Sequence, residues 1–189
     1  NLLMPGDLLR EWISNQRIDL HVLSALAKRF QVSFEALCIR FIKFTTQRAI
    51  LVYWDNGFVK YEWRSSSAVK TRARIRRTDD PQEPLPGTLA ADSTVEQEWD
   101  GTEMSAAIWC PEEAPHMKLR EFKHSYTTGD RVLTLLLLES AEPRSWDRSW
   151  QDGESFDSFD QFVSNESFPT WYESGRGSVF PRRDESERG

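Results

Sequence analysis

Apolar side chains recur every three to four residues over residues 1–46, a spacing that predicts helices. The first helix is expected to start at Pro5, since proline suits a first helical position, and the second follows Asp19, a good N-cap. Ser33 can cap a third helix, whose apolar face is Phe34, Leu37, Cys38 and Phe41. The short break between the last two helices predicts a helix-turn-helix-like pair.

From Arg48 onward the pattern changes to short β-rich runs. In AILVYWDNGFVKYEW the dipeptide Asn56-Gly57 accepts the positive φ angles of a type I′ turn, which predicts a hairpin. The run RVLTLLLLE is apolar at successive positions, so we expect a central strand that is buried on both faces. A Pro-rich connection is expected at residues 79–88, and further strands are predicted at Val69–Arg76, Thr94–Trp99, Ser105–Trp109 and Lys118–Tyr126.

The composition shifts again after Glu139. Ser, Gly and Asp dominate there, and eleven acidic residues stand against six arginines. Aliphatic residues are too few to offset the entropy of ordering, so the sequence predicts a disordered acidic tail that contains Ser and Trp. The expected fold class is α+β, with a helical segment at 1–46, a small and mainly antiparallel β domain at 47–140, and the tail at 141–189.

Charge and hydropathy narrow the range of partners. The net charge of −6 gives no general electrostatic attraction to nucleic acid or acidic lipid. No apolar run approaches the roughly 18 residues that a membrane helix needs, so no membrane partner is expected. Cys38 and Cys110 lie far apart in apolar contexts, which favours free buried thiols in a reducing cytoplasm over a disulfide.

The sequence has none of the common catalytic motifs. It contains no His-Glu-x-x-His, no Cys-x-x-Cys, no Gly-x-Ser-x-Gly and no phosphate-binding Gly-rich loop. His124 follows Glu121 by three residues, but the pattern KLREFKHSY favours a strand, in which the two side chains point to opposite faces. We therefore assign no catalytic residue, no metal ligand and no cofactor to this chain.

One stretch carries alternating positive charges, at Lys70, Arg72, Arg74 and Arg76. On a strand these four side chains would share one face, with Arg77 adjoining. Such a face can protect an edge strand from aggregation, which is the simpler interpretation. It can also bind an anionic partner such as nucleic acid, and the four residues are the candidate site for that function.

Two motifs near the N-terminus carry a resemblance to a known family. The first is Leu2-Leu3-Met4-Pro5, and the second is Leu-x-x-Leu-Ala-x-x-Phe-x-Val-Ser-x-x-Ala-Leu-x-x-Arg, which runs from Leu23 to Arg40. In order and spacing they resemble the segment downstream of the active site in the ImmA/IrrE family of zinc metallo-endopeptidases. The resemblance covers roughly residues 1–139 and is weaker beyond 46.

The resemblance implies that both zinc histidines, the catalytic glutamate and the third ligand precede Asn1, and that zinc belongs to the full-length parent. It also implies a cytoplasmic protease that cleaves a helix-turn-helix transcriptional repressor in a stress response. This chain would be its C-terminal fragment, inactive alone, supplying scaffold, substrate docking and regulation. The alternative is a non-catalytic module that binds DNA or protein through the helix-turn-helix-like pair and the basic strand.

Overall fold

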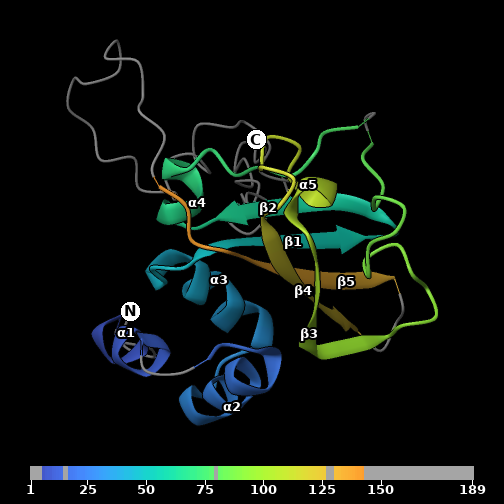
Figure 1. The fold of residues 1–189 in the computed structure, drawn as a ribbon. Helices are drawn as coiled ribbons and strands as arrows, with labels where there is room; N and C mark the ends of the chain where they lie inside the picture. Colours follow the sequence, from blue (N-terminus) through green and yellow to red (C-terminus); the bar gives the residue numbers. More distant parts are fainter. Residues whose placement is uncertain (1–5, 15–16, 79–80, 127–129, 143–189) are drawn as a thin grey trace, which may run out of the picture. The chain divides into compact units, whose positions relative to one another are not determined.

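Three helices lead into a five-stranded antiparallel sheet in the computed structural model, which describes residues 6–14, 17–78, 81–126 and 130–142 (Figure 1). This arrangement is an α+β fold and confirms the predicted class. Residues 143–189 of the predicted acidic tail lie outside the described residues. No helix in the described ranges is long and apolar enough to cross a membrane.

The second and third helices each begin at a residue whose side chain accepts a free backbone N–H. The three helices are α1 (Gly6–Ser14), α2 (Leu20–Phe30) and α3 (Phe34–Phe44). The Asp19 carboxylate accepts the Val22 N–H at 2.8 Å, and the Ser33 hydroxyl accepts the Ala36 N–H at 3.2 Å. Gln31 takes a left-handed conformation, with φ of 53°, and ends α2. The two N-terminal caps, Asp19 and Ser33, are those that the sequence predicted.

The predicted hairpin is also present. It joins β1 (Arg48–Asp55) to β2 (Phe58–Arg64). Asn56 and Gly57 have φ values of 53° and 81°. Positive φ at both central residues is the geometry of a type I′ turn, and its twist matches that of the flanking strands.

The sheet order is β2-β1-β5-β4-β3, with every neighbouring pair antiparallel. The other three strands are β3 (Gln97–Ser105), β4 (Lys118–Ser125) and β5 (Arg131–Leu138). β5 pairs with β1 on one side, where Arg48 lies opposite Leu138, and with β4 on the other. The apolar run RVLTLLLLE therefore forms the central strand, as predicted.

Both faces of the sheet are covered, as the side chains of β5 show. Successive residues of this strand point to opposite sides of the sheet. Leu133, Leu135 and Leu137 belong to the core that includes the helix residues. Leu136 and Leu138 belong to a second core, on the other face, beneath loops and short helices. In Figure 1, α1, α2 and α3 lie together on one side of the sheet.

The strand predicted at Val69–Arg76 is wrong. A short helix, α4 (Ser66–Lys70), occupies its beginning, and the Ser65 hydroxyl caps it by accepting the Ala68 N–H at 3.2 Å. Arg72 follows in a left-handed conformation, with φ of 58°. The serine run at residues 65–67, just before this segment, favours a capped helix over a strand, because serine oxygens bond nearby backbone N–H groups.

The strand predicted at Ser105–Trp109 is wrong as well, since α5 (Ala106–Trp109) stands there. β3 starts later than the predicted Thr94–Trp99 strand and continues to Ser105. Its register with β4 shifts between Glu98 and Thr102. Gly101 lies in this irregularity with φ of 86°, and a Cβ at that position would lie 2.5 Å from the Phe122 ring. A glycine lets the edge strand bulge over that ring.

Candidate functional site

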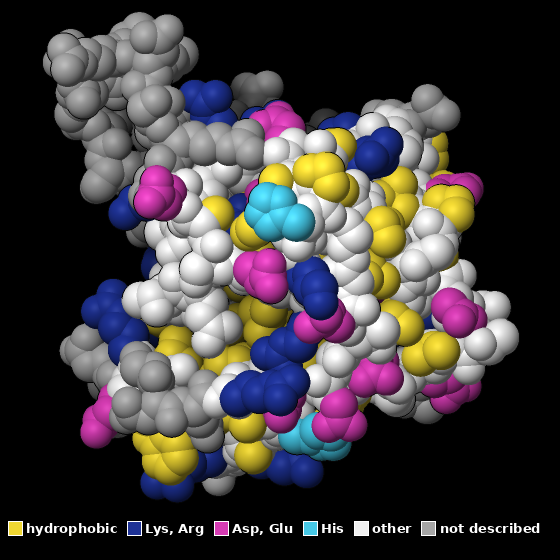
Figure 2. All heavy atoms as spheres, viewed as in Figure 1, with side chains coloured by type: hydrophobic (Ala, Val, Ile, Leu, Met, Phe, Trp, Pro, Cys, Tyr) yellow, Lys and Arg dark blue, Asp and Glu magenta, His cyan; other side chains and the backbone are white. Residues whose placement is uncertain are grey.

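The four basic residues of the predicted anion site do not lie on a strand. Lys70 ends α4, and Arg72, Arg74 and Arg76 follow in a segment without a strand partner in the described residues. The alternation survives, because Thr71, Ala73 and Ile75 are buried between these basic side chains. Arg74 and Arg76 are exposed, and Figure 2 shows basic and acidic side chains intermixed over the face that it presents. Anion binding here stays a prediction.

The described residues place no group of three His, Cys, Asp or Glu side chains where it could hold a metal ion. Cys38 and Cys110 are free and buried. Burial raises the pKa of the Cys38 thiol, and it raises the pKa of Cys110 to about 12. A protonated, buried thiol is a poor nucleophile, so neither cysteine is a candidate catalytic group.

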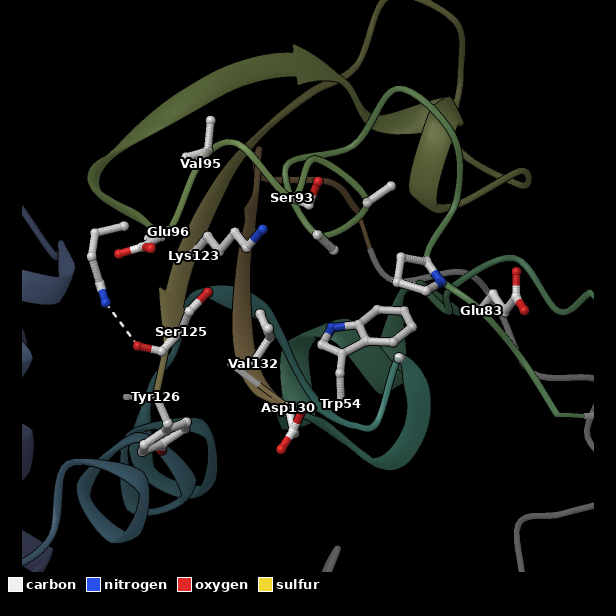
Figure 3. A pocket seen from close by; sticks show the side chains of 15 residues that line it. Trp54, Glu83, Ser93, Val95, Glu96, Lys123, Ser125, Tyr126, Asp130 and Val132 are labelled. Carbon is white, nitrogen blue, oxygen red and sulfur yellow. Dashed lines mark hydrogen bonds between the residues drawn. The ribbon is translucent and has the colours of Figure 1, made fainter. Parts of the chain in front are cut away.

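A cavity of about 770 Å³ lies on the sheet face opposite the three helices. Its floor comes from the sheet, through Trp54 of β1, Lys123 of β4 and Val132 of β5. Its wall comes from the connection that leads into β3, and Figure 3 shows Ser93 and Val95 on that wall. The volume falls in the range of small-molecule sites, so this cavity is the candidate functional site.

Lys123 is the basic side chain that lines the cavity, and it is only 3% exposed. Its ammonium group donates a hydrogen bond to the Asp92 carbonyl oxygen at 2.7 Å. Burial lowers the pKa of the amine, while the charges of Asp92 and Glu121 oppose that change. Lys123 therefore holds the wall of the cavity against the sheet.

Glu121 lies two residues earlier on the same face of β4 and is fully buried. Its carboxylate accepts the Ala90 N–H at 2.8 Å and the Trp109 indole N–H at 3.0 Å. Burial raises the pKa of this carboxyl, and the two hydrogen bonds work in the opposite direction. Glu121 thus anchors a second point of the same connection, next to the cavity.

The Trp54 indole at the floor is fixed in one orientation. Its N–H donates to the Thr134 hydroxyl at 3.0 Å, on the neighbouring strand. The ring also lies against Trp109, with centroids 6.2 Å apart. A bonded, buried indole gives the cavity a rigid apolar floor.

A further aromatic cluster lies on the helix side of the sheet. The His124 ring centroid is 4.9 Å from that of Phe34, 4.8 Å from that of Tyr126 and 5.6 Å from that of Trp99. Its Nδ1 is 2.8 Å from Gln97 Oε1, and burial lowers the pKa of the imidazole. The cluster joins α3 to β3 and β4, so its role is to dock the helices. Glu121 and His124 point to opposite faces, as the sequence predicted.

A buried ion pair lies at the start of β1. Arg48 Nη2 donates to Glu113 Oε1, and the two side chains are 4% and 5% exposed. Arg48 Nε donates to the Thr71 hydroxyl at 2.8 Å, and Nη1 donates to the Glu139 carbonyl at 2.7 Å. One guanidinium thereby ties three separate chain segments to the start of β1.

Glu121 and Lys123 are not among the site residues that the sequence predicted. One sequence signal could have identified Glu121 and Lys123. The strand KLREFKHSY is expected to lie in the same sheet as the apolar run RVLTLLLLE, and a sheet with such a central strand is covered on both faces. Charged residues at alternate positions of a covered strand must find partners. The loop that supplies those partners has no periodic pattern from which its position could be predicted.

No family model matches the chain, and no curated protein matches it.

Proposed function

We propose that this chain is the non-catalytic C-terminal part of an ImmA/IrrE-like metallo-endopeptidase that cleaves a helix-turn-helix repressor. The observation that carries the proposal is the pair of motifs from Leu2 to Arg40, in one order and one spacing. The fold is compatible with it, because four apolar positions of the second motif are buried in the core that the helices share with one face of the sheet: Leu23, Leu26, Ala27 and Leu37.

In this proposal the helices form the scaffold and the sheet carries regulation. α3 contacts α1 and α2 on one side and β1 and β2 on the other. The helices and one sheet face share a single core. A change in the packing of the sheet would therefore reach the helical segment directly, and through it the zinc-bearing helices that the proposal places before the Leu-Leu-Met-Pro motif.

Zinc enters the proposal only through that preceding portion. The described residues bring together no set of His, Cys, Asp or Glu side chains that fits a tetrahedral zinc ion. No catalytic step is therefore assigned to them. Their part in proteolysis is to support the catalytic helices and to hold the repressor.

The alternative, a DNA-binding module, is less well supported by the geometry. A recognition helix must present several side chains to base edges in the major groove. In α3 only Ala36 and Lys43 are exposed, and the rest of the helix is buried or half-buried against α1, α2 and the sheet. The helix pair is therefore proposed as a structural element.

The first test is to read the gene upstream of the codon for Asn1. An in-frame His-Glu-x-x-His within a few tens of codons supports the proposal, whereas a start codon next to Asn1 contradicts it.

The second test is biochemical. The longer protein is incubated with a helix-turn-helix repressor from the same genome, and cleavage is followed on a denaturing gel. Cleavage that a chelator abolishes and added zinc restores is the expected result. The matched control replaces the glutamate of His-Glu-x-x-His by glutamine. Cleavage that persists in this control, or none with any repressor of the genome, would reject the proposal.

A further inference from the structure

The cavity contains a buried cation, the Lys123 ammonium, that makes one hydrogen bond within the described residues. A lysine ammonium has three N–H donors. One of them goes to the Asp92 carbonyl, and the described residues place no carboxylate within salt-bridge distance of Lys123. Glu121 balances part of the charge, but its bonded donors are Ala90 and Trp109. Among the described residues this buried ammonium has one hydrogen-bond acceptor, so two of its N–H donors are available to a ligand acceptor.

The mouth of the cavity has the opposite charge. Glu83, Glu96 and Asp130 line it, and all three residues are exposed. Figure 3 shows Glu83 and Glu96 on opposite sides of the space above Trp54. Three carboxylates at the mouth repel a multiply charged anion such as a phosphate and attract a protonated amine.

Apolar side chains at the floor and the sides make up much of the remaining lining. Trp54 and Val132 form the floor, and Pro84, Ala91 and Val95 line the sides. The Trp54 ring is held by Thr134, so it offers a fixed surface rather than an adaptable one. A ligand that fits has an apolar body, an acceptor for the Lys123 ammonium and a cationic group that faces the carboxylates of the mouth.

We propose that this cavity binds a small amino-acid-like zwitterion whose carboxylate accepts hydrogen bonds from Lys123 and whose ammonium group faces the acidic mouth. The inference needs no part of the metallo-endopeptidase proposal, because it rests on the cavity alone. The rival explanation is that Lys123 serves only to fasten Asp92 to the sheet.

Three indole compounds with the same body separate the contribution of the carboxylate from that of the ammonium group. L-Tryptophan has both charged groups, indole-3-propionate lacks the amine, and tryptamine lacks the carboxylate. Each is titrated into the ¹⁵N-labelled 189-residue chain, and amide and indole N–H shifts are followed by NMR. The Trp54 indole N–H and the Ala90 amide are the reporters, because they lie at the floor and at the wall.

We expect L-tryptophan to bind with the lowest dissociation constant. Indole-3-propionate should bind several-fold more weakly, because an exposed charge pair contributes little, and tryptamine at least about tenfold more weakly. Lys123→Met should weaken L-tryptophan binding by at least about tenfold. The control is Lys118→Met on the same strand, whose exposed ammonium pairs with Glu103 outside the cavity, and it should leave binding unchanged.

If Lys123→Met fails to fold, Ser93→Trp provides an independent test, because it fills the cavity from an exposed position of the wall. It should abolish the shifts that L-tryptophan causes. The proposal is overturned if none of the three compounds binds, if tryptamine binds as tightly as L-tryptophan, or if Lys123→Met binds normally. Equal binding of all three would mean that the cavity recognises only the indole ring and that Lys123 serves only to hold Asp92 against the sheet.

Discussion

Replacing Arg48 by methionine should lower the free energy of unfolding by about 3–5 kcal/mol. The Arg48 guanidinium bonds the Glu113 carboxylate, the Thr71 hydroxyl and the Glu139 carbonyl. Methionine keeps much of the length and removes all three donors. The Glu113 carboxylate, 5% exposed, would then stay buried without its cation.

The magnitude follows from that orphaned charge. A hydrogen bond to a charged group contributes about 1.5–3 kcal/mol, but the three bonds of one guanidinium are not additive. Breaking a buried ion pair from one side costs about 3–5 kcal/mol, which already includes the uncompensated partner. Since domains are stable by about 5–15 kcal/mol, the loss is a large share of the total.

Urea unfolding followed by tryptophan fluorescence measures the effect, because Trp54 and Trp109 are buried in the same core. The double variant Arg48→Met/Glu113→Leu should recover most of the loss, since it leaves no buried charge. Lys118→Met, which breaks an exposed pair with Glu103, should leave the urea midpoint within experimental error.

Two outcomes would refute this reasoning. A loss below about 1 kcal/mol in Arg48→Met would mean that the pair is not buried in solution, since exposed pairs contribute that little. A double variant no more stable than Arg48→Met would place the loss in the packing of methionine, and not in the Glu113 charge.

Three further outcomes are expected. Gly101→Ala should lower the free energy of unfolding by about 2 kcal/mol or more, measured in urea, because the φ of 86° and the Phe122 ring leave no room for a Cβ. Burial lowers the pKa of His124, so the unfolded chain takes up a proton first as the pH falls. Stability measured against pH should then decrease below about pH 6.5, and His124→Phe should remove that part of the slope. Cys38 and Cys110 should not react with dithiodipyridine in the folded protein and should react in denaturant, because both thiols are buried with a raised pKa.

The elements that local sequence determines were predictable. Asp19 and Ser33 cap the helices through their own side chains, and Asn56-Gly57 selects its turn through its own backbone preferences. The run RVLTLLLLE is apolar at successive positions, so both of its faces must be buried, and it occupies the central position of the sheet, where both faces are covered. These features depend on a few adjacent residues, so reading the chain locally was sufficient.

The wrong predictions concern segments whose conformation depends on residues that are distant in the sequence. The segment after Lys70 alternates between basic and apolar residues like a strand. Within the described part of the chain it pairs with no strand, and its apolar residues Ala73 and Ile75 pack in the second core. Ala106–Trp109 reads as β-compatible but forms a helical turn held by the Met117 carbonyl. The cavity likewise depends on the contacts of the connection into β3, which bonds Glu121 through Ala90 and Lys123 through Asp92. No local sequence pattern predicts these contacts.

The central strand has a consequence for the order of synthesis. β5 is the last strand along the described chain, yet it is the only link between the β1–β2 hairpin and the β3–β4 pair within the sheet. Until Arg131–Leu138 has been made, the growing chain carries two half-sheets, and β1 and β4 each expose an unpaired edge. A chain that stalls before this strand would therefore offer sites for misassembly with other chains, and the completed strand removes both edges in a single step.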